Sequence, residues 1–171
     1  MRVADYIFKY LKDYGVDCVF LVVGGGSMYL NDALKKSGIK YICCHHEQAC
    51  AIAAEGFART SGKIGVFCVS SGPAGTNSIT GVLGAYLDSV PLLGLSGQVK
   101  RQTLKTGNLR QLGDQEADII SMVKPITKYA KLIMEPKDIK GELKKAIEIA
   151  TTPRFGPVWL DLPLDVQGGQ I

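Results

Sequence analysis

Short, continuous apolar runs alternate with helix-like segments along nearly the whole chain, and most of these runs end at a glycine or a polar turn. Residues 18–23, 64–69 and 91–95 are such runs. A run without polar alternation is typical of a strand that is buried on both faces. Strands that alternate with helices favour a parallel sheet with helices on both of its faces. We therefore expect an α/β fold, a three-layer, open and mostly parallel sheet, in a single domain over residues 1–171.

The individual elements follow from this alternation. Apolar residues recur at helical spacing from Val3 to Leu11, and Gly15 then ends the pattern as a helix C-cap. Further helices are predicted at residues 28–37, 47–60, 76–87 and 136–150, with a shorter one at 115–123. Strands are predicted at residues 18–23, 40–44, 64–69, 91–95, 127–132 and 157–161. The polar segment 98–114 shows no clear period, so no element is predicted there.

Composition excludes several classes of protein. The 20 Lys and Arg against 16 Asp and Glu give a net charge of only +4, without the concentrated basic face that nucleic-acid binding needs. No run of about eighteen apolar residues occurs, so we expect no membrane-spanning helix. The N-terminus mixes apolar and charged residues and does not match a signal peptide. Five cysteines without regular spacing indicate free thiols and a cytoplasmic protein.

Several common site motifs are incomplete in this chain. Gly62-Lys63-Ile64 lacks the spacing and the hydroxyl residue of a P-loop, and the glycines at 24–26 lack the third glycine of a dinucleotide fingerprint. No Gly-x-Ser-x-Gly nucleophile elbow occurs. The Cys and His residues within 43–50 do not have metal-ligand spacing, so we predict no metal site in this chain.

Three polar turns, at residues 24–26, 46–48 and 71–77, each follow a predicted strand. The carboxyl ends of parallel strands meet at one edge of the sheet, where open α/β sheets bind ligands. Glu47 stands at the N-terminus of a helix that is otherwise apolar over its first turns. A single carboxylate there is better explained as a favourable partner of the helix dipole. We interpret Glu47 as functional because two glycine turns accompany it.

A set of longer motifs keeps its order along almost the whole chain. The motifs are HEQ at residues 46–48, AAEGFAR at 53–59, SGPAGTN at 71–77, DSVP at 88–91, SGQV at 96–99 and GPVWLDLP at 156–163. Together they resemble the N-terminal pyrimidine-binding (PYR) domain of thiamine-diphosphate-dependent enzymes, in the acetolactate synthase-like branch. The resemblance implies the thiamine-diphosphate-binding fold, an α/β fold of the kind that the alternation predicts.

The resemblance also implies chemical roles for two residues. Glu47 matches the family's catalytic glutamate, whose carboxyl group binds N1′ of the cofactor's pyrimidine ring and promotes the imino tautomer. That tautomer removes the proton from the thiazolium carbon C2 of the cofactor. Gln115 matches a family glutamine on the substrate side of the site.

Four further residues are implied as cofactor-binding residues. Gly24 and Gly25 would let the backbone approach the cofactor closely, because a Cβ atom is absent. Pro73 would lie beside the pyrimidine ring, and Asn77 would brace the turn where the next helix begins. For each of the four, a plain role in a turn or cap is the alternative.

By this resemblance, the chain is part of an enzyme that decarboxylates a 2-keto acid, with formation of an acetohydroxy acid as an open outcome. The implied cofactor is thiamine diphosphate with Mg²⁺. The metal is held in this family by a diphosphate-binding domain, whose Gly-Asp-Gly…Asn motif does not occur here, so we expect no activity from this chain alone. The resemblance leaves open whether the full-length enzyme also carries FAD.

The implied partners are a second copy of the chain and the diphosphate-binding domain. We expect a homodimer through the cofactor-binding edge, with that domain in the same full-length protein or in a second subunit. We interpret the chain as a piece of a longer protein. An α subunit of a two-subunit 2-keto acid decarboxylase and a catalytically silent interaction domain are the alternatives. An anion-binding module using Lys100, Arg101, Lys105 and Arg110 is disfavoured, because no aromatic residue accompanies these charges.

Overall fold

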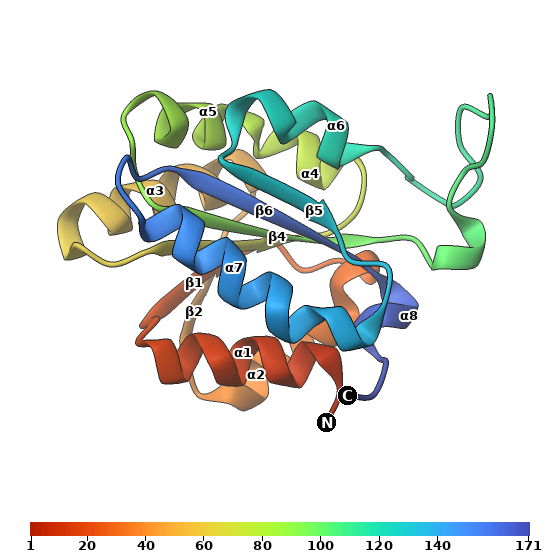
Figure 1. Cartoon of the computed structure of the whole chain (residues 1–171), viewed down its shortest axis with the longest axis horizontal. Coiled ribbons are helices and arrows are strands. Elements are labelled where there is room, and N and C mark those ends of the chain that lie inside the picture. The colour runs from red at the N-terminus through yellow and green to blue at the C-terminus, as the bar shows by residue number, and fades with distance from the viewer.

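Six strands form one sheet in the computed structural model, which describes residues 1–171 (Figure 1). The strands are β1 (Cys18–Leu21), β2 (Lys40–Cys43), β3 (Gly65–Val69), β4 (Leu92–Gln98), β5 (Tyr129–Leu132) and β6 (Pro157–Pro163). Their order across the sheet is β2-β1-β3-β4-β6-β5, and every neighbouring pair is parallel. The α/β class is confirmed, and the sheet is wholly rather than mostly parallel.

Helices cover both faces of this sheet. The α-helices are α1 (Val3–Tyr14), α2 (Met28–Ser37), α3 (Glu47–Ser61), α4 (Pro73–Asn77), α5 (Ile79–Leu87), α6 (Ile119–Val123), α7 (Ile139–Thr151) and α8 (Leu164–Gln167). Four short 3₁₀ segments, η1 (Gly25–Ser27), η2 (Arg101–Thr103), η3 (Lys124–Ile126) and η4 (Pro136–Asp138), complete the elements. In Figure 1, α1, α2 and α7 lie below the sheet, and α3, α4, α5 and α6 lie above it.

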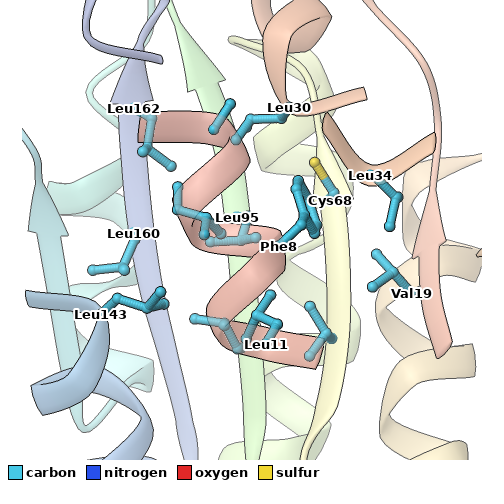
Figure 2. Packing of buried hydrophobic residues seen from close by; sticks show 14 of the residues in the cluster. Phe8, Leu11, Val19, Leu30, Leu34, Cys68, Leu95, Leu143, Leu160 and Leu162 are labelled. Carbon is cyan, nitrogen blue, oxygen red and sulfur yellow. The ribbon is translucent and has the colours of Figure 1, made fainter. Parts of the chain in front are cut away.

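The sheet separates two apolar clusters. On the lower face, Figure 2 shows Phe8 of α1 beside Cys68 of β3 and Leu11 of α1 near Leu95 of β4. Leu143 of α7 lies beside Leu160 of β6 in the same cluster. Helix α1 forms because its apolar residues fall on one side at helical spacing, and Gly15 ends it in the left-handed conformation at φ 99°. On the upper face, Phe67 and Trp159 meet edge to face with their ring centroids 5.3 Å apart.

The structure corrects several predicted boundaries. The segment predicted as one helix at 76–87 is two helices, because the first begins at Pro73 and a second begins at Ile79. Residues 115–118 are not helical, and α8 was not predicted. Strand β4 continues to Gln98 and β6 continues to Pro163, past their predicted ends. Strand β2 lies at the edge of the sheet and is exposed at all of its positions, so it is not a core strand.

Candidate functional site

The turns that follow β1 and β3 lie against each other at the carboxyl edge of the sheet. Strand β1 lies between β2 and β3, so the strand order reverses at this point, which is where open α/β sheets bind ligands. The backbone N–H of Gly26 donates a hydrogen bond to Ser70 Oγ at 3.1 Å. A Cβ atom on Gly24 would lie 2.5 Å from the Cβ of Ser70. Gly24 therefore allows the close packing of the two turns.

Gly25 is different from its neighbour, because nothing in the chain requires glycine there. It is exposed, its φ is not in the left-handed region, and a Cβ atom on it would have no neighbour within 4 Å. The absence of a side chain leaves open surface directly beside the turn of β3. The fold thus accounts for Gly24 and leaves Gly25 available for close approach by a ligand.

Glu47 is the first residue of α3, after the three-residue turn that follows β2, and it is partly buried. The preceding residue, His46, caps the helix by accepting a hydrogen bond from the N–H of Gln48 on its Nδ1 at 3.1 Å. His46 is thereby explained as a structural residue. The carboxylate of Glu47 stands at the positive end of a fifteen-residue helix, where negative charge is stabilised.

Asn77 holds one oxygen of this carboxylate. Its Nδ2 donates a hydrogen bond to Glu47 Oε2 at 3.0 Å, although thirty residues separate the two positions in the sequence. The other oxygen, Oε1, has no hydrogen-bond partner within the chain. The predicted place of Asn77, at the start of a helix, is wrong: it is the last residue of α4, which begins at Pro73. This position carries its side chain across to the first turn of α3.

Gln115 lies against the turn that precedes α4. Gly72 has φ 59°, and a Cβ atom on it would be 2.0 Å from the carbonyl oxygen of Gln115. Gln115 itself adopts a positive φ of 55°, with an exposed side chain that makes no hydrogen bond within the chain. Pro73, the next residue after Gly72, is also exposed. The structure therefore brings Gln115 and Pro73 to the same turn.

These contacts link five of the six predicted site residues through neighbouring turns, and the sixth, Gly25, follows Gly24 in the chain. Gly24 packs on the β3 turn, that turn leads through Pro73 to Asn77, and Asn77 holds Glu47. This surface offers a free carboxylate oxygen, an exposed proline and a glycine without neighbours. A flat heteroaromatic ring fits such a surface. The residues present therefore fit the pyrimidine part of the implied cofactor.

A second polar cluster at this edge was not predicted. Asp161 on β6 is 1% exposed and accepts hydrogen bonds from Ser96 Oγ at 2.6 Å and from Gln98 Nε2 at 2.9 Å. Burial raises the pKa of Asp161 to about 7. The sequence carries a signal for this cluster. Ser96 and Gln98 are two residues apart, as are Trp159 and Asp161, so each pair lies on one face of an otherwise apolar strand.

A cavity of about 400 Å³ lies beside this cluster, at the carboxyl ends of β4, β5 and β6. Its lining includes Gln98, Asp161, Ala117, Asp118, Leu132 and Met134. The cavity is separate from Glu47, which is not among its lining residues. It adjoins the segment that follows Gln115.

No group of three or more His, Cys, Asp or Glu side chains is arranged to hold a metal ion, and all five cysteines are free thiols. None of the helices has the length and apolar character needed to cross a bilayer.

Comparison with known proteins gives a consistent result. Residues 1–122 match the family model described as "Thiamine pyrophosphate enzyme, N-terminal TPP binding domain". The chain is 43% identical over 171 residues to a probable acetolactate synthase large subunit of Methanocaldococcus jannaschii, covering 100% of this chain and 28% of the relative. It is 44% identical over 164 residues to the acetolactate synthase large subunit of Lactococcus lactis, covering 95% of this chain and 28% of the relative.

A plant relative shows the same relationship. The chain is 41% identical over 165 residues to the chloroplastic acetolactate synthase of Arabidopsis thaliana, covering 96% of this chain and 24% of the relative. The chain thus spans about a quarter of the length of the curated relatives that it matches.

Proposed function

Because the chain belongs to the thiamine pyrophosphate enzyme family and corresponds to its N-terminal TPP-binding domain, we propose that it forms the pyrimidine half-site of an enzyme that decarboxylates a 2-keto acid. The reaction is of the acetolactate synthase type, in which an acceptor keto acid is joined to the decarboxylated donor. The observation that carries the proposal is the Glu47 carboxylate, held on one oxygen by Asn77 and free on the other.

The role of Glu47 in this proposal is to exchange a proton with N1′ of the pyrimidine ring. Asn77 orients the carboxyl group by occupying Oε2, which leaves Oε1 for the ring nitrogen. The α3 N-terminus stabilises the charge on the carboxylate between proton transfers. The cofactor itself, when bound, supplies the nucleophilic carbon and the electron sink for decarboxylation.

Binding surface for the ring comes from the two turns. The exposed Pro73 offers an apolar, rigid face, and the open surface at Gly25 allows backbone polar groups to come close to the ligand. Gln115 is the proposed substrate-side residue, and its carbonyl group packs on Gly72 at the same turn. Each of these three positions is supported by its place at the carboxyl edge of the sheet.

The remaining parts of the enzyme belong to the same proposal. A diphosphate-binding domain, in the same protein or in a second subunit, would hold Mg²⁺ and the diphosphate group, and a homodimer would bring the two halves together. The relatives support this division, because the matched segment is about a quarter of their length.

The variant Glu47→Gln tests the proposal in the complete protein, supplied with thiamine diphosphate and Mg²⁺. The substitution keeps the shape of the side chain and removes its proton exchange, so the release of CO₂ from pyruvate should fall at least about a hundredfold. The matched control is Glu55→Gln, which removes a carboxylate from the same helix, where it pairs with Arg59. Full turnover in Glu47→Gln would contradict the proposal.

A further inference from the structure

Gln98 joins the sheet to the segment that carries Gln115. Its side chain is 3% exposed, and its Nε2 donates two hydrogen bonds, one to Asp161 Oδ2 and one to the carbonyl oxygen of Ala117, both at 2.9 Å. Its Oε1 accepts a hydrogen bond from the N–H of Val99 at 2.9 Å. Every polar atom of this amide is therefore used, which fixes its orientation.

The other end of this connection is anchored in the sheet. Asp161 Oδ1 accepts the hydroxyl hydrogen bond of Ser96 at 2.6 Å, and Ser96 Oγ accepts one from Trp159 Nε1 at 2.8 Å. Ser96 and Asp161 are paired across β4 and β6. All four side chains project from alternate positions on the α3–α5 face of the sheet, which is the face that carries Glu47.

The segment that Gln98 holds is in contact with the proposed cofactor site. Ala117 follows Gln115 by two residues, and the carbonyl of Gln115 packs on Gly72. The carboxylate of Glu116 accepts hydrogen bonds from the N–H groups of Lys105 at 2.6 Å and Leu112 at 2.9 Å, closing the loop between them. Residues 113–118 belong to no helix or strand, and the side chains of Gln98 and Glu116 both form hydrogen bonds that hold this segment.

Stability alone does not require this cluster. A buried carboxyl group is costly to desolvate, and apolar residues of similar volume commonly replace such groups without loss of stability. The surrounding layer is apolar, with Phe67, Leu92 and Trp159 all fully buried. A hydrogen-bonded polar cluster in such a layer is better explained by a role in placing the segment at Ala117, which Gln98 binds, than by a role in stability.

We propose that Gln98, held by Asp161, is a positioning residue that fixes residues 113–118 so that Gln115 faces the substrate at the pyrimidine half-site. This inference rests on the proposed function, because it assigns the segment to the substrate side of that site. Gln98 acts through Ala117 and Gln115 and does not touch the substrate.

The primary test is Gln98→Met in the complete protein, because methionine keeps the length of the side chain and loses both donors. The KM for pyruvate should rise about tenfold, the size of one net hydrogen bond, while kcat and the affinity for thiamine diphosphate stay within about threefold. Amide hydrogen exchange should become faster within residues 105–117. The matched control is Gln102→Met, an exposed glutamine without a side-chain hydrogen bond, which should change none of these.

A second set of variants separates positioning from folding. Asp161→Asn keeps an acceptor for Gln98, so its KM should stay within about threefold of the wild-type value. Loss of the hydrogen bond would raise the KM by more than this. The double variant Asp161→Asn with Gln98→Glu places the carboxylate at position 98 and the amide at position 161. The hydrogen-bonded pair between these positions is kept, but position 98 no longer has a donor for the carbonyl of Ala117. The double variant should fold and show the raised KM of Gln98→Met.

Unchanged KM and unchanged exchange in Gln98→Met or in the double variant would overturn the inference. So would a lower Tm with an unchanged KM, because the cluster would then serve stability alone. The proposed function is judged separately by Glu47→Gln. If that variant is inactive while the Gln98 variants behave as wild type, only the positioning role fails, and if it is fully active, the proposed function fails.

Discussion

At the scale of single residues, the two oxygens of Glu47 are unequal. Oε2 is bound by Asn77 at 3.0 Å, and Oε1 has no partner within the chain. A carboxyl group that rotates freely would place either oxygen at a ligand, whereas one held by an amide donor presents a defined oxygen. Orientation of this kind is a separate contribution to catalysis from the proton exchange itself.

The contribution of Asn77 can be measured by Asn77→Ala. Loss of one orienting hydrogen bond should lower kcat about tenfold, a smaller effect than that of Glu47→Gln. The assay is the same CO₂ release in the complete protein, with Asn108→Ala in the exposed loop as the control. A kcat equal to that of the wild type would show that the bond between Asn77 and Glu47 does not orient the carboxyl group.

At the scale of elements, the polar pairs between β4 and β6 extend both strands. In the sequence, the polar residues Ser96 and Gln98 resemble the end of an apolar strand, so the apolar pattern predicts a strand that ends at residue 95. They continue the strand because Asp161, directly opposite Ser96, accepts their hydrogen bonds. A single sequence does not show that partner, which is sixty-five residues away from Ser96.

The burial of Asp161 makes the stability of the chain depend on pH. Burial raises the pKa of Asp161 from an ordinary 3.8 to about 7, so the folded state binds this proton more tightly than the unfolded state. The resulting stability is complete below about pH 4 and is lost as the pH rises through about 7. Relative to Asp161→Asn, which does not titrate, the wild type should therefore lose up to about 4 kcal/mol of unfolding free energy between pH 4 and pH 8.

Urea denaturation of the two chains at both pH values measures this difference. Using the difference between wild type and variant cancels the titration of all the other groups. The same difference at pH 4 and pH 8 would mean that Asp161 keeps an ordinary pKa in the folded chain, and that the cluster holds a charged carboxylate at little cost.

At the scale of the whole molecule, the sheet order explains why distant turns form one surface. Because all strands are parallel and β1 lies inside the sheet, the turns after β1 and β3 are neighbours at one edge. The sequence predicts this convergence, because the apolar runs at 18–23 and 64–69 are each followed by a turn that contains glycine. It also predicts helices such as α2 at residues 28–37, where the apolar spacing is regular and Gly38 follows with φ 75°.

Contacts within the site are less predictable than the fold. The bond between Asn77 and Glu47 depends on where α4 begins, and the start at Pro73 is decided by the turn at Gly72, which in turn accommodates Gln115. Such a boundary arises from packing between segments that are more than forty residues apart. Local sequence periodicity carries no information about it.

In the proposed function, Glu47 promotes removal of the proton from C2 of the bound cofactor. The most direct measurement is the rate of hydrogen–deuterium exchange at that carbon, followed by acid quenching and NMR in the complete protein without substrate. The rate should fall at least about a hundredfold in Glu47→Gln and stay unchanged in Glu55→Gln. Equal exchange rates in the wild type and in Glu47→Gln, with the cofactor bound in both, would contradict the claim.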